Sequence, residues 1–144
     1  MAIFLSKLKA QAFAKEISDE NTLVITADTI VCLGKIILGK PENYNDAVRM
    51  LKMLSGKKHE VITAVSLTSK QKQKTFFASS YVYFKKLSDE EINFYITNFK
   101  PYDKAGAYGV QDWIGFVGIK KIVGSYFNVM GLPVKELYEE LKIF

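Results

Sequence analysis

Residues 23–33 read LVITADTIVCL, an apolar and β-branched run with Thr26 and Asp28 inside it. A run of this kind is typical of a buried β-strand. The residues that follow, GKIILGKP at 34–41, predict a glycine turn, a short return strand and an exit fixed by Pro41. The sequence therefore predicts a strand hairpin that carries a carboxylate within an apolar strand.

Four segments around this hairpin have helical patterns. They are the residues up to about Ile17, a helix capped by Asn43 or Asn45 that ends near Leu54, a helix opened by a Ser88–Glu91 capping box that ends near Asn98, and a last helix with Pro133 at its first position.

Three further segments have extended patterns. Residues 61–67 (VITAVSL) and 75–84 (TFFASSYVYF) flank a lysine-rich turn and predict an antiparallel hairpin, and residues 113–124 (WIGFVGIKKIVG) predict another strand. Because strands and helices alternate with hairpins inserted, the sequence predicts an α/β fold with a mixed sheet. Its length and the lack of linkers predict one domain over residues 1–144.

The composition limits the partners of the chain. It is 49% apolar, with a net charge of +5. Arg49 is its only arginine; sequence-specific nucleic-acid readers usually rely on arginine, so we expect no nucleic-acid partner. No apolar run reaches the ~18–20 residues that span a bilayer, so we expect no membrane partner. Cys32 is the only cysteine, which fits a reducing, cytoplasmic compartment.

Two charged residues near the first hairpin are candidates for chemistry. If Asp28 lies at the carboxyl end of its strand, it faces the usual ligand crevice of an α/β sheet, where it can bind Mg²⁺ or accept a proton from water. The alternative is a carboxylate that caps a turn or pairs with a lysine. Lys40, between Gly39 and Pro41, is either a phosphate-binding point charge or a solvated lysine.

The loop at 101–111, PYDKAGAYGVQ, is the third candidate. Its glycines permit close approach of a backbone or a ligand, and the Gln111 amide can read a base edge. The alternative is a structural loop in which Asp103 and Lys104 form a local ion pair. His59 has no cysteine or second histidine near it in sequence, so we expect a structural role for it and no zinc cluster.

Six blocks of sequence occur in an order that is similar to the Maf family of nucleoside triphosphate pyrophosphatases. They are ITADTIV, LGKP, AVRMLKMLSGKKHEVITAV, LSDEEINFYI, DKAGAYGVQ and GSYFNVMGLPVKELYEEL. The resemblance runs from about Leu5 to Leu141. It implies an inosine-triphosphatase-like α/β fold, with a mixed sheet and flanking helices in two lobes around a nucleotide cleft. It also implies cleavage of a nucleoside triphosphate to the monophosphate and pyrophosphate, with Mg²⁺ or Mn²⁺.

The same resemblance implies roles for individual residues. Asp28 matches the general base and metal ligand of the family, and Lys9 and Lys40 match lysines that bind the triphosphate. Thr29 and Gln111 match the subgroup that prefers dTTP and UTP. Asp103 and Lys104 fall in the same motif and are assigned to the substrate site.

Two departures from the family pattern bear on activity. The N-terminal strand and Ser-x-Ser-Pro-Arg-Arg loop of the family are not found in residues 1–144, and Ser80 stands where the family usually has Asp. An N-terminally shortened chain is therefore expected to expose an unpaired strand edge or an apolar surface. An alternative function follows, a catalytically impaired nucleotide-binding or regulatory protein, since members of the family are linked to arrest of cell division. A homodimer is left open.

Overall fold

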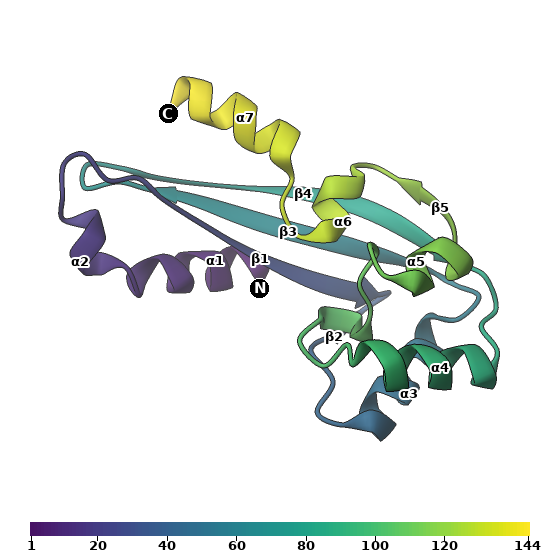
Figure 1. Cartoon of the computed structure of the whole chain (residues 1–144). Coiled ribbons are helices and arrows are strands. Elements are labelled where there is room, and N and C mark those ends of the chain that lie inside the picture. The colour runs from purple at the N-terminus through teal and green to yellow at the C-terminus, as the bar shows by residue number, and fades with distance from the viewer.

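The computed structural model describes all residues, 1–144, and is built on one five-stranded sheet. The strands follow the order β2-β1-β3-β4-β5 across the sheet (Figure 1). Their bounds are β1 Val24–Leu33, β2 Ile36–Leu38, β3 Lys58–Thr68, β4 Gln73–Phe84 and β5 Ile119–Val123.

The α/β class with flanking helices is confirmed, and both predicted hairpins are present. In place of the expected mixed sheet, all four strand pairings are antiparallel. The reason lies in the connections. Tight turns join β1 to β2 and β3 to β4. After β2 and the helix that follows it, the chain returns to β1, where β3 pairs with β1 and runs in the opposite direction.

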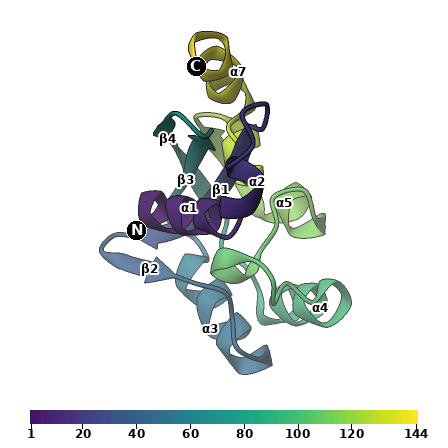
Figure 2. The same ribbon diagram turned by 90° about the vertical axis from the view of Figure 1, so that its left-hand side faces the viewer.

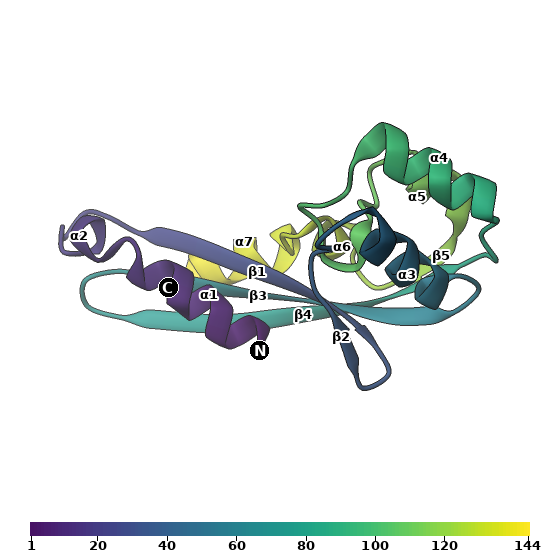
Figure 3. The same cartoon turned by 90° about the horizontal axis from the view of Figure 1, so that it is seen from below.

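Helices cover both faces of the long part of the sheet. Helix α1 (Ala2–Gln11) crosses β1, β3 and β4 on one face, and α7 (Val134–Ile143) lies on the opposite face (Figures 1 and 3). The predicted first helix is divided, because the chain turns before the short α2 (Ala14–Ile17). None of the helices combines the length and apolarity that crossing a bilayer requires.

A second group of helices gathers at the other end of the sheet. Helices α3 (Tyr44–Leu54) and α4 (Asp89–Phe99) lie together there, and Figure 2 shows them on the opposite side of the sheet from α7. Asn43, not Asn45, caps α3, and the predicted Ser88–Glu91 capping box opens α4. Their apolar faces and the adjoining strand ends enclose the main hydrophobic core of 17 buried residues.

The segment 113–124 was predicted entirely as a strand, and this prediction is wrong for its first half. Residues Trp113–Gly118 form helix α5, and only Ile119–Val123 form a strand. Tertiary packing overrides the local β-branched preference. Trp113 packs edge-on against Phe94, Ile114 is fully buried, and a Cβ at Gly115 would clash with the Val110 carbonyl.

Two short elements complete the chain. A single 3₁₀ turn, η1 (Ala105–Ala107), lies in the glycine-rich loop, and α6 (Tyr126–Met130) precedes the last helix. Pro133 is the N-cap of α7 and so lies one position before the predicted one.

Candidate active site

Asp28 lies in the middle of β1, and its side chain points toward α1. The predicted position inside an apolar strand is therefore confirmed, and Asp28 does not lie at the carboxyl end, because pairing with β3 continues without a break to Cys32. The Lys9 ammonium lies 2.8 Å from Asp28 Oδ1 and donates to the Ala27 carbonyl at 2.9 Å. The other carboxylate oxygen makes no hydrogen bond within the protein and is free for a ligand.

Thr29 points to the opposite face of β1, as alternation along a strand requires. Its hydroxyl lies 2.8 Å from that of Thr63, directly across the sheet on β3. Thr63 donates in turn to the backbone carbonyl of Asn128 in α6 at 3.0 Å. The two faces of β1 thus carry different groups, an ion pair on one and a chain of hydroxyls on the other.

The outer edge of β1 is unpaired along residues 24–30, because β2 pairs only with residues 31–33. This agrees with the exposed strand edge that was expected. A pocket of about 290 Å³ is lined by both Asp28 and Thr29, whose side chains lie on opposite faces, so the pocket curves around this edge. Its volume lies just below the range of ~300–1,000 Å³ that is typical of small-molecule sites.

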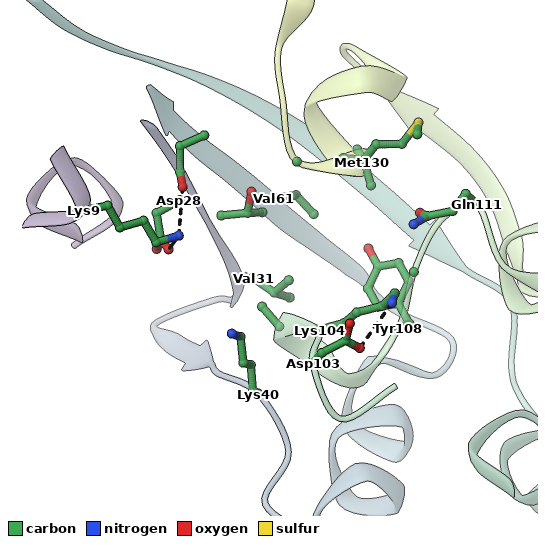
Figure 4. Close-up of a pocket in the computed structure, with 16 residues that line it drawn as sticks. Lys9, Asp28, Val31, Lys40, Val61, Asp103, Lys104, Tyr108, Gln111 and Met130 are labelled. Atoms are coloured by element: carbon green, nitrogen blue, oxygen red, sulfur yellow. Dashed lines mark hydrogen bonds and ion pairs between the residues drawn. The ribbon is translucent and has the colours of Figure 1, made fainter. Parts of the chain in front are cut away.

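The glycine-rich loop forms the wall across from β1 (Figure 4). The Gly106 amide donates to the Gly39 carbonyl at 3.1 Å, which joins this loop to the segment that carries Lys40. Gly106 has a φ of 73°, and a Cβ there would lie 3.2 Å from the Val31 side chain. Glycine is therefore required for the close approach of the loop to β1.

Buried tyrosines hold the loop from behind. Tyr95 donates to the Asp112 carboxylate at 2.8 Å and accepts from the Gly109 amide at 3.0 Å. The Tyr108 hydroxyl lies 2.6 Å from Nε2 of His59. Burial raises the pKa of both tyrosines and lowers the pKa of His59 to about 4, so all three are neutral near pH 7. The structural role expected for His59 agrees with this position in the core.

The structure brings all seven predicted site residues to the same pocket. They are Lys9, Asp28, Thr29, Lys40, Asp103, Lys104 and Gln111. Lys9 and Asp28 face Lys40 and Lys104 across the pocket, and Gln111 lies beside Met130 at the remaining end (Figure 4).

Sequence reasoning missed the contribution of α6. Its residues Val129 and Met130, with Gly131, line the pocket near Thr29 and Gln111. The NVMG block was part of the family resemblance, but nothing in its composition indicated a place in the site. The buried Thr63 and Asn128, which support Thr29 from behind, gave no signal either.

The family described as Maf-like protein matches residues 1–144.

The chain belongs to the Maf family.

Several relatives that share one name align over nearly the whole chain. The dTTP/UTP pyrophosphatase of Christiangramia forsetii is 55% identical over 139 residues, which cover 96% of this chain and 70% of that protein. The dTTP/UTP pyrophosphatase of Phocaeicola vulgatus is 54% identical over 140 residues, covering 97% and 72% respectively. That of Porphyromonas gingivalis strain W83 is 48% identical over 143 residues, covering 99% and 72%.

Charge in the pocket of this Maf protein is distributed over three lysines and two carboxylates. Lys104 lies 3.3 Å from Asp103, and its hydrogen bond holds the pKa of that carboxyl below its usual range. The local ion pair that the structural alternative included is therefore present, and it lies at the pocket. No three His, Cys, Asp or Glu side chains cluster as a metal cage. The pocket carboxylates still suit Mg²⁺, which is commonly held by one or two carboxylates together with substrate phosphates.

Ser80, the departure from the family's Asp, lies outside this pocket. It is fully buried, donates to the Ser125 carbonyl at 3.0 Å and accepts from the Asn128 side chain at 2.9 Å. Gly124 packs so closely on it that a Cβ there would lie 2.8 Å from the Ser80 hydroxyl. In this Maf protein, Ser80 anchors α6 to the sheet.

Proposed function

We propose that this chain is a nucleoside triphosphate pyrophosphatase that hydrolyses dTTP and UTP to the monophosphate and pyrophosphate. The observation that carries the proposal is the convergence of one partly free carboxylate and three lysines in a single pocket. The names of the relatives supply the reaction and the two substrates.

The lysines suit the anionic part of such a substrate. Lys9 lies on one side of the pocket and Lys40 and Lys104 on the other, so a triphosphate between them is contacted by cations from both sides. Phosphoryl transfer depends mainly on position and on charge stabilisation, because negative charge spreads over the phosphate oxygens. The lysines therefore orient the α phosphate and stabilise the departing pyrophosphate.

Asp28 suits the role of base toward water. Its Oδ1 is held by Lys9, which fixes the carboxylate, while the other oxygen remains able to accept a proton. Water that loses its proton to Asp28 attacks the α phosphorus, and the bond to the bridging oxygen breaks. Asp28, together with the substrate phosphates, would hold a divalent metal, which would supply further positive charge to these oxygens. Asp103, on the opposite wall, is a second carboxylate within the pocket.

The remaining end of the pocket suits the base. It is formed by Val129, Met130 and Gly131, with Thr29 and Gln111 as the polar groups. An apolar surface with a few hydrogen-bonding groups is typical of sites that bind a flat ring. Thr29 and Gln111 are therefore proposed to contact the pyrimidine.

Product analysis tests this proposal. The chain is incubated with UTP or dTTP and Mg²⁺, and the nucleotide products are separated by chromatography. The expected products are the nucleoside monophosphate and pyrophosphate, in equal amounts, and a chelator stops their formation. Nucleoside diphosphate and inorganic phosphate would contradict the bond assignment. Nucleotide binding without any turnover would instead support the regulatory alternative.

A further inference from the structure

One direction of hydrogen bonding behind Thr29 satisfies both contacts of the Thr63 hydroxyl. The Asn128 backbone carbonyl can only accept, so Thr63 must donate to it across their 3.0 Å contact. A hydroxyl has one hydrogen, so Thr63 can only accept from Thr29 at 2.8 Å. The Thr29 hydrogen is thereby used within the protein, and the hydroxyl offers a ligand only lone pairs.

The Asn128 carbonyl is itself held in place. The Asn128 side chain is fully buried and donates to the Val61 carbonyl at 3.1 Å and to Ser80 at 2.9 Å. Its amide donates to the Ser125 hydroxyl at 3.2 Å, at the start of α6. The acceptor at the end of the chain of hydroxyls therefore does not turn away, and the direction of the Thr29 hydrogen bond is maintained.

The Thr29 hydroxyl is open to the base end of the pocket. A Cβ added to Gly131 would lie 3.6 Å from the Thr29 oxygen, and glycine leaves that space to a ligand. Gln111 lies across this end of the pocket, as Figure 4 shows, and its amide can donate. The site thus presents a fixed acceptor beside an adjustable donor.

We infer that Thr63 is a positioning residue that makes Thr29 an obligate acceptor, and that this selects bases with a hydrogen on ring nitrogen N3. Uracil and thymine carry that hydrogen between two carbonyl acceptors. Cytosine has a bare lone pair at N3, which would face the lone pairs of Thr29. The inference rests on the proposed function for the location of the base, and it extends that function to a preference for uracil and thymine over cytosine.

Binding of non-hydrolysable analogues tests the inference without turnover. The α,β-methylene analogues of UTP and CTP are titrated calorimetrically into the parent chain and into Thr63→Val, Thr63→Ser and Thr75→Val. Valine removes the Thr63 hydroxyl at nearly constant shape, and serine restores it. Thr75→Val is a matched control, because it removes a hydroxyl of the same sheet that bonds Ser66 away from the pocket.

The expected result is a preference of the parent for the UTP analogue that Thr63→Val reduces about fivefold or more. Thr63→Ser and Thr75→Val keep the parent ratio. An unchanged ratio in Thr63→Val, loss of preference in either control, or failure of the parent to bind or distinguish the analogues would overturn the inference. If the variants show the predicted binding ratios but the parent releases no pyrophosphate from UTP, the inference about Thr63 stands and the proposed activity is rejected.

Discussion

The Lys9 ammonium lies 2.8 Å from the Asp28 carboxylate and also donates to the Ala27 carbonyl, so one lysine joins helix α1 to the middle of strand β1. Its side chain is 54% exposed, whereas that of Asp28 is 17% exposed. The pair therefore presents a cation toward the pocket while it orients a largely covered carboxylate. Both contacts are compatible with a role toward phosphate.

Replacement of Lys9 separates stability from activity. Ion pairs with exposed partners contribute less than about 1 kcal/mol, so Lys9→Ala is expected to reduce the free energy of unfolding only slightly. A charged hydrogen bond to phosphate is worth about 1.5–3 kcal/mol, so kcat/KM for UTP is expected to fall about tenfold or more. Lys7→Ala, on the same helix and outside the pocket, is the control. Equal kinetics for the two variants would remove Lys9 from the site.

The approach of the glycine-rich loop to β1 depends on Gly106. Gly106→Ala places a side chain at a φ of 73° and within 3.2 Å of Val31. A left-handed conformation costs about 1–2 kcal/mol for a residue with a Cβ, and urea unfolding is expected to show at least this loss. Gly39 has no atom near its potential Cβ and has no positive φ, so Gly39→Ala is the matched control. Equal stability of the two variants would contradict the required close approach.

The burial of His59 predicts that the stability of the fold depends on pH. Burial lowers its pKa in the folded chain to about 4, whereas the unfolded value is 6.5. Between pH 4 and pH 6.5 the unfolded chain binds more protons than the folded chain. The free energy of unfolding therefore keeps its full value above pH 6.5 and falls as the pH is lowered toward 4. The His59 contribution to this loss is about 3 kcal/mol. His59→Gln, which cannot titrate, is expected to show a shallower slope in urea titrations over this pH range. Parallel slopes would contradict the buried, neutral histidine.

Local signals predicted much of this fold. The strand around Asp28, both hairpins and the caps of α3 and α4 depend on neighbouring residues, and the structure contains them all. Helix α5 was not predictable in this way, because it depends on the packing of Gly115 against Val110 and of Trp113 against Phe94.

Part of the candidate site was likewise predictable from the sequence, and part depends on the folded chain. The family motifs indicated seven of the residues that line the pocket, from Lys9 to Gln111. The position of Asp28 inside an apolar strand was predicted from composition, and the structure confirms it. The hydrogen bond from Thr63 to Asn128 joins residues 65 positions apart, and neither residue type is distinctive by itself. Only the folded chain shows that Thr63 joins the Thr29 hydroxyl to the Asn128 carbonyl.

The most direct test of the proposed activity compares the parent chain with Asp28→Asn. Asparagine keeps the shape of the side chain but cannot accept a proton as a carboxylate does. Pyrophosphate release from UTP with Mg²⁺ is measured for both chains, with thermal unfolding as a check that both are folded. The predicted result is a loss of kcat/KM of about 100-fold or more in a folded variant. A folded Asp28→Asn chain that keeps most of the parent activity would contradict the assignment of this pocket as the active site.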